Sequence, residues 1–177
     1  DVIFADHESL LEQAGEHLST HAADPWAAVC ETANLVFDRF RENRDLSARR
    51  FLVVQQVPAL RDREIVTGFR YERLFVDYLR SAVPEEPVLR VIGFAAAVTA
   101  CHNYLLRNMT RGDESATAEA LNQALLDVRR TFGVAPADPA RTGESVLVAA
   151  YPAGTPVDEV MRQVEARLTA RTSAGDR

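Results

Sequence analysis

The feature that most constrains this chain is a helical spacing of apolar residues, which recurs in successive segments up to residue 133. Apolar side chains three and four positions apart lie on one face of an α-helix, so each segment predicts an amphipathic helix. The expected helices cover residues 2–21, 25–43, 46–57, 58–83 and 88–109, and a sixth ends at Gly133. Because none of these segments alternates like a strand, we expect an all-α domain of six helices.

Proline, glycine and small polar residues mark the ends of these helices. Asp24 is expected to cap a helix whose first residue is Pro25. Pro58 restricts the backbone of Val57 and so separates the third helix from the fourth. In the loop "TRGDES", Asp113 or Ser115 is expected to cap the sixth helix.

The composition changes after Gly133 to alanine, proline, aspartate and glycine, which is typical of a linker. Beyond it, "SVLVAAY" predicts a short strand over residues 145–151, and Thr155-Pro156 predicts the start of a last helix. We therefore expect a helical domain over 1–133, a linker over 134–144 and a strand-helix appendage over 145–177. The strand must either pair with its copy in a second subunit or fold back over the body.

Charge and composition exclude several classes of protein. A chain of 177 residues with a net charge of −6 and a pI near 5.3 is not expected to bind nucleic acid by itself. The longest apolar run, "VIGFAAAVTAC", is too short to cross a bilayer, and no signal peptide is visible, so we expect a cytoplasmic protein without membrane contact. The chain starts without methionine, which predicts that it is part of a longer protein.

Few residues have the spacing of a metal or catalytic site. His17 and His21 lie four positions apart with Asp24 just beyond, but two solvated histidines at a helix end are the simpler interpretation. Cys101 and His102 are adjacent, so on a helix they point about a hundred degrees apart and are poorly placed as nucleophile and base. We expect no metal, no cofactor and no enzymatic activity.

The aromatic residues are more informative, because they occur in four consecutive predicted helices beside a few polar side chains. Apolar walls with a few polar groups are typical of a ligand pocket. They are equally typical of a solid helical core, and composition leaves both interpretations open. In "FLVVQQVPALRDRE", an inward-facing Gln55 or Gln56 would need hydrogen-bonding partners, either structural or from a ligand.

Two segments resemble the ligand-binding domain of TetR-family transcriptional regulators. "VPALRDREIVTGFRYERLFVDYLR" opens the fourth predicted helix, and "DVIFADHESLLEQ" is similar to the segment that follows the family's DNA-binding head. The likeness covers residues 1 to about 133 and is greatest for actinobacterial members similar to the mycofactocin-system regulator. It implies a homodimeric repressor that senses a small apolar or amphipathic ligand and contacts DNA only through a helix-turn-helix head absent from this sequence.

The resemblance also suggests which residues serve each role. The ligand would meet polar contacts from Gln55, Cys101 and His102 and an apolar wall of Phe37, Phe40, Phe51, Val54, Phe69, Val98 and Leu105. The fifth and sixth helices would form a four-helix bundle with a second subunit through Ala96, Thr99, Asn103, Leu106, Leu121, Leu125 and Val128. Small residues at Ala95, Ala96, Ala97 and Ala100 agree with close helix packing. The rival functions are an interaction module without a cavity and an enzyme that uses the same cavity.

Overall fold

The computed structural model describes residues 5–20, 23–136, 156–162 and 164. The chain divides into two compact units, Asp1–Ala135 and Pro136–Arg177, with the boundary inside the predicted linker. All regular structure in the described residues is helical. Residues 157–162 are helical, as predicted for the last helix, whereas the predicted strand over 145–151 lies outside the described residues.

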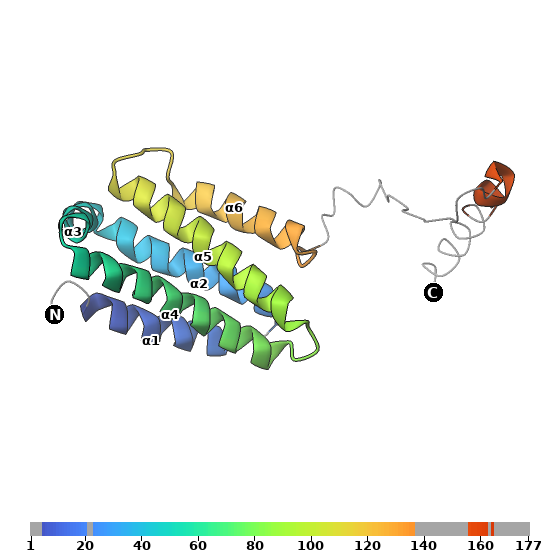
Figure 1. Cartoon of the computed structure of the whole chain (residues 1–177), viewed down its shortest axis with the longest axis horizontal. Helices are drawn as coiled ribbons and strands as arrows, with labels where there is room; N and C mark the ends of the chain where they lie inside the picture. Colours follow the sequence, from blue (N-terminus) through green and yellow to red (C-terminus); the bar gives the residue numbers. More distant parts are fainter. Residues whose placement is uncertain (1–4, 21–22, 137–155, 163, 165–177) are drawn as a thin grey trace. The chain divides into compact units, whose positions relative to one another are not determined.

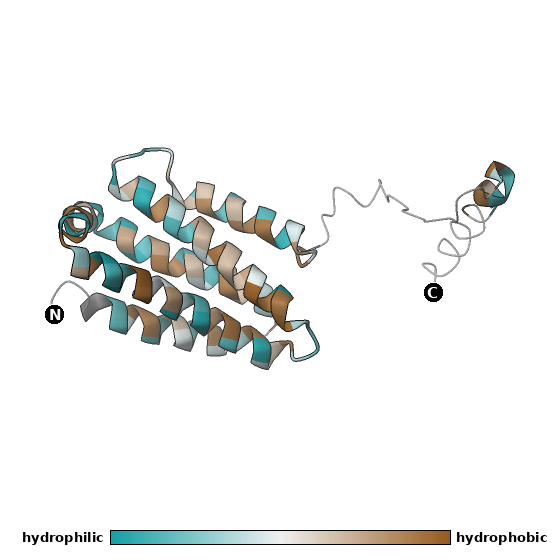
Figure 2. Cartoon of the chain, viewed as in Figure 1, coloured by the Kyte–Doolittle hydropathy of each residue, from teal (hydrophilic) through white to brown (hydrophobic). Residues whose placement is uncertain are grey.

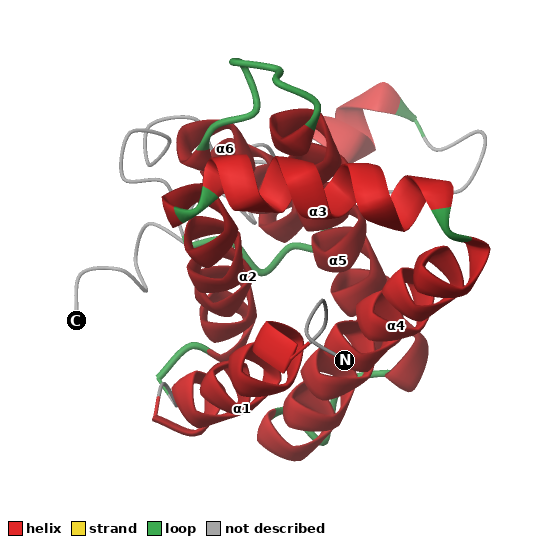
Figure 3. Ribbon diagram, turned by 90° about the vertical axis from the view of Figure 1, so that its left-hand side faces the viewer, coloured by secondary structure: helices red, strands yellow, loops and turns green. Residues whose placement is uncertain are grey.

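The first unit contains the six predicted helices (Figure 1). In chain order they are α1 (Ala5–Thr20), α2 (Pro25–Glu42), α3 (Arg44–Gln56), α4 (Pro58–Ala82), α5 (Val88–Thr110) and α6 (Ala118–Thr131). Helices α1, α2, α4, α5 and α6 run along a common direction, and α3 crosses one end of this bundle (Figures 1 and 3). At this end, α3 contacts α2, α4 and α5.

Glycine ends two of the helices through the same hydrogen-bond pattern. Gly112 and Gly133 have φ angles of +91° and +65°, a conformation that residues with a Cβ rarely adopt. After α6, Gly133 N donates to Arg130 O (3.0 Å) and Val134 N donates to Arg129 O (2.9 Å). This is a Schellman motif, and it confirms Gly133 as the end of the sixth helix.

The cap of α6 differs from the prediction. The hydroxyl of Thr117 accepts a hydrogen bond from Ala120 N at 3.1 Å, so Thr117 is the N-cap. Asp113 instead accepts hydrogen bonds from Ser115 N and Oγ at 2.9 and 2.7 Å, which stabilise the preceding turn. The helix therefore begins later than a cap at Asp113 or Ser115 would place it.

The core is formed by aromatic and aliphatic side chains from all helices except α3. Phe94 of α5 is fully buried and packs edge-on against Trp26 and Phe132, with ring centroids 4.8 and 5.5 Å apart. Each helix carries both hydrophobic and hydrophilic residues, as expected of amphipathic helices (Figure 2). In the part of the chain that the structure describes, α5 alone is long and apolar enough to span a membrane. It packs against α2, α3, α4 and α6, which accounts for its buried apolar residues, whereas Leu89 and Ile92 remain exposed.

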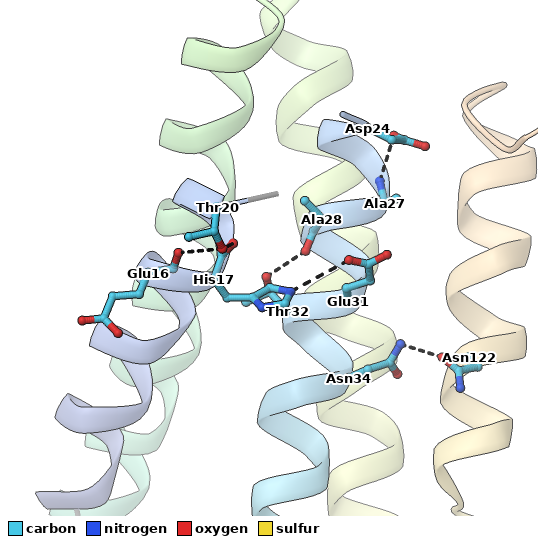
Figure 4. Close-up of polar contacts among 10 residues, drawn as sticks. All are labelled: Glu16, His17, Thr20, Asp24, Ala27, Ala28, Glu31, Thr32, Asn34 and Asn122. Carbon is cyan, nitrogen blue, oxygen red and sulfur yellow. Dashed lines mark hydrogen bonds and ion pairs between the residues drawn. The ribbon is translucent and has the colours of Figure 1, made fainter. Parts of the chain in front are cut away.

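Polar contacts stabilise α2 and join it to α6 (Figure 4). Asp24 caps α2 by accepting a hydrogen bond from Ala27 N at 3.0 Å, as predicted. Thr32 is fully buried and donates its hydroxyl proton to Ala28 O at 2.7 Å. Asn34 Nδ2 donates to Asn122 Oδ1 at 2.6 Å, which links α2 to α6.

Candidate ligand-binding cavity

A cavity of about 260 Å³ lies between the first five helices. Each helix contributes to its wall, for example through His7 of α1, Phe40 of α2, Phe51 of α3, Phe69 of α4 and His102 of α5. Most of the lining is apolar, which is typical of small-molecule sites. Ile65 and Phe69 line the cavity yet remain 50% and 63% exposed, so the cavity opens to solvent along α4.

The structure places half of the predicted ligand-binding residues on this wall. Phe40, Phe51, Val54, Phe69 and His102 line the cavity. The side chains of Phe37 and Val98 are fully buried in the helical core instead. Gln55, Cys101 and Leu105 do not line the cavity.

The side chains of the two glutamines in α3 lie outside the cavity wall. Gln55 is half-buried, and its backbone carbonyl accepts a hydrogen bond from Arg61 Nη2 of α4. Gln56 is exposed at the end of α3. Neither side chain contributes to the cavity wall, so the predicted ligand contact of Gln55 is not supported.

The predicted dimer interface requires a correction. Leu121 and Leu125 are 0% and 1% exposed because they pack in the core of their own chain, so they are not available to a second subunit. Thr99, Asn103 and Leu106 face the cavity. Ala96 and Val128 are half-buried. The apolar spacing predicts two packing faces of α5, but it does not indicate which partner each face meets.

Three buried polar atoms in the cavity wall lack a hydrogen-bonding partner among the described residues. They are Tyr71 Oη of α4 and Thr99 Oγ1 and His102 Nε2 of α5. Each unsatisfied buried group of this kind costs about 1–3 kcal/mol. The sequence analysis did not identify Tyr71 as a cavity residue and assigned Thr99 to the dimer interface. Buried polar atoms are normally paired with protein, ordered water or a ligand, so this part of the cavity is a site for a small polar group.

The same three residues also line a smaller recess of about 20 Å³. Ala33 and Val36 of α2 and Phe75 of α4 form the rest of its apolar lining. The recess and the larger cavity share five residues, namely the same three together with Val36 and Asn103, so the two spaces adjoin. A space of this size accommodates a single water-sized group.

Burial keeps the polar groups of the recess uncharged at neutral pH. It lowers the pKa of His102 from 6.5 to about 4, and only the hydrogen bond with Asn103 opposes this shift. Burial also raises the pKa of Tyr71 well above its usual value. His102 Nδ1 lies 3.3 Å from Asn103 Oδ1, which can only accept. The tautomer with the proton on Nδ1 satisfies this contact and makes Nε2 an acceptor.

Charged groups occur elsewhere in the cavity wall. Arg50, Glu64, Glu72 and Arg107 line the larger space, whereas the recess has no formally charged side chain in its lining. The wider part of the cavity therefore combines a mostly apolar wall with four charged side chains, whereas the recess is neutral. A ligand that enters the recess must present an uncharged group there.

The features considered for catalysis and metal binding do not form a reactive centre in the described residues. Cys101 is half-buried outside the cavity wall, and burial raises the pKa of its thiol, which disfavours a nucleophilic thiolate. Burial also raises the pKa of Cys30, to about 12. His21 lies outside the described residues, and the described ones contain no group of three metal-ligating side chains.

Comparison of the chain with protein-family models, with curated proteins and with solved structures finds no match. The TetR resemblance consequently depends on the sequence segments given above. The function of the first unit is inferred from the cavity and the helices around it.

Proposed function

We propose that the first unit is the effector-binding and dimerisation domain of a TetR-like bacterial transcriptional repressor in the cytoplasm. In this proposal a small, largely apolar molecule binds in the cavity and alters DNA binding by a helix-turn-helix head outside this sequence. The cavity is the observation that carries the proposal, because the alternative of an interaction module predicts a solid core. The raised thiol pKa of Cys101 argues against the alternative of a cysteine-dependent enzyme.

Helix α1 offers a physical route from the cavity to the proposed head. Its His7 lines the cavity and lies against Phe40, with ring centroids 5.3 Å apart. One helical position further, Glu8 accepts hydrogen bonds of 2.6 and 2.8 Å from Arg70 of α4. A ligand that displaces Phe40 or α4 would therefore change the position of α1. Coupling of about 1–3 kcal/mol between ligand and head would be ordinary for such a switch.

The outer face of α5 supports the proposed homodimer. Ile92 and Tyr104 are 39% and 66% exposed, and Ala96 and Ala100 lie between them at steps of four residues. Small residues at this spacing allow two helices to approach closely. This face replaces the interface of Leu121 and Leu125 predicted from the sequence, and α6 beside it would complete a four-helix bundle in the dimer.

Gly68 allows the proposed ligand site to be tested by filling it. A Cβ atom at this position would lie 3.5 Å from Asn103 Nδ2, an ordinary contact, and any longer side chain would extend into the cavity. Gly68→Leu should abolish binding of the neutral fluorescent probe N-phenyl-1-naphthylamine, measured by its fluorescence increase. Gly68→Ala is the matched control and should retain binding, because it adds only the tolerated Cβ.

Equal probe binding by the parent protein and Gly68→Leu would contradict the proposal. That result would assign the probe to apolar side chains exposed on the surface, such as Leu52 and Val66. Circular dichroism of both variants should show unchanged helix content, so that a loss of binding reports on the cavity and not on unfolding.

A further inference from the structure

We propose that the cavity selects a neutral ligand with an apolar body and one hydroxyl group, and that this hydroxyl binds in the recess between Tyr71, Thr99 and His102. The inference rests on the proposed function, since it names the chemical class of the effector. Its basis is the group of three unpartnered polar atoms, two of them on side chains that are less than one-tenth exposed.

The positions of the three residues bring their polar atoms to one place. Thr99 and His102 lie three residues apart on α5 and so share a face, and Tyr71 comes from the adjacent α4. All three line both the cavity and the recess. Thr99 and His102 are 8% and 9% exposed, so water in the bulk solvent has little access to them.

The hydrogen-bonding character of these atoms matches a hydroxyl group. His102 Nε2 is an acceptor, because Nδ1 carries the proton toward Asn103 Oδ1. The hydroxyls of Tyr71 and Thr99 can each donate. A ligand hydroxyl can donate to His102 Nε2 and accept from Tyr71 or Thr99, whereas a ketone or ether oxygen would leave Nε2 unpaired.

Size and charge exclude larger or ionised head groups. The recess of about 20 Å³ holds one water-sized group, which fits a hydroxyl but not a carboxylate or a phosphate. Its other lining side chains include Ala33, Val36 and Phe75, and none of its lining residues carries a formal charge. An ionised group would therefore lose its hydration without gaining a countercharge.

The volume of the whole cavity limits the size of the apolar part of the ligand. Its volume of about 260 Å³ is just below the range of about 300–1,000 Å³ that is typical of sites for drug-sized molecules. Phe40, Phe51 and Phe69 in its wall suit a compact aromatic or branched aliphatic body. A substituted phenol or a short apolar alcohol has both the required head and the required size.

The test compares three probes that differ only in the head group: 4-butylphenol, 4-butyltoluene and 4-butylbenzoate. Their affinities are measured by displacement of N-phenyl-1-naphthylamine from the whole chain. The phenol should bind at least about tenfold more tightly than the benzoate. It should also bind no more weakly than the toluene, although the toluene is more hydrophobic.

Two variants that each remove one hydroxyl identify the atoms responsible. Tyr71→Phe and Thr99→Val should each weaken binding of the phenol by about two- to tenfold, the usual effect of one hydrogen bond. Binding of the toluene should not change. Ser81→Ala is the control, because it removes one hydroxyl from an exposed position of α4 that does not line the cavity.

The outcomes separate this inference from the proposed function. Equal or tighter binding of the benzoate, or an unchanged phenol affinity in both variants, would overturn the hydroxyl inference and leave the cavity as an effector site. A lower melting temperature of both ligand-free variants would also overturn it, because it would show that the hydroxyls already have partners. Failure of all three probes to bind would overturn the inference and count against the proposed function.

Discussion

His102 occupies an unusual position for an ionisable residue, since its ring is buried between the cavity and the core. Its ring packs edge-on against Phe37 with centroids 6.0 Å apart, and its Nδ1 contacts Asn103. Charging this ring would place a cation beside apolar side chains. The ring is therefore neutral in the folded state, so the stability of the domain depends on pH.

This coupling predicts a loss of stability in mild acid. The pKa of His102 is about 4 in the folded chain and 6.5 when solvated, so between these values only the unfolded chain takes up the proton. The free energy of unfolding should fall as the pH falls through this window, by about 3 kcal/mol in total. Urea denaturation at pH 7, 5 and 4 measures it.

His102→Phe is the control for this prediction, because it keeps a ring against Phe37 but cannot take up a proton. The free energy of unfolding of the parent minus that of the variant should fall by about 3 kcal/mol from pH 7 to pH 4. A difference that does not depend on pH would show that His102 titrates normally in the folded protein.

At the scale of single helices, the sequence predicts where they lie better than which way they face. Pro25, Pro58 and Gly133 mark helix ends because proline and glycine have backbone restrictions that act locally. The direction that each face of α5 takes depends instead on contacts with four other helices. Residues of α5 assigned to a dimer interface consequently line the cavity.

The start of α6 shows why a cap is difficult to assign. Asp113, Ser115 and Thr117 are all residue types that cap helices, and only the structure shows that Thr117 makes the capping hydrogen bond. Thr117→Ala should therefore lower the free energy of unfolding by about 1 kcal/mol. Ser115→Ala should cost less. Urea denaturation of the two variants checks this order, and the reverse order would restore the cap predicted from the sequence.

At the scale of the whole molecule, the division of the chain predicts that the first unit folds alone. The helical core of this unit is formed by residues up to Val134. A chain truncated after Ala135 should therefore keep a single cooperative melting transition near that of the whole chain, measured by circular dichroism at 222 nm. Loss of that transition would mean that residues 136–177 are required for folding. An unchanged melting temperature together with an unchanged dimer mass would count against both hypotheses for the tail, pairing with a second subunit and folding back over the body.

The candidate site could be predicted only in part from the sequence. Phe40, Phe51, Val54 and Phe69 line the cavity, but Phe37 and Val98, which were predicted for the same wall, are core residues. A space in the packing results from side chains of five helices together, so no single segment specifies it. Unpaired polar atoms such as Tyr71 Oη are likewise recognisable only when their surroundings are known.

The most direct test of the proposed function is native mass spectrometry of the whole chain as purified from cells, followed by identification of any small molecule that dissociates. The account predicts a dimer that carries an apolar, hydroxyl-bearing molecule in each chain. Ala100→Glu should shift this dimer toward monomer, because it places a charge on the exposed face of α5. If the unmodified chain is folded but is a monomer without a bound molecule, the proposed function is contradicted.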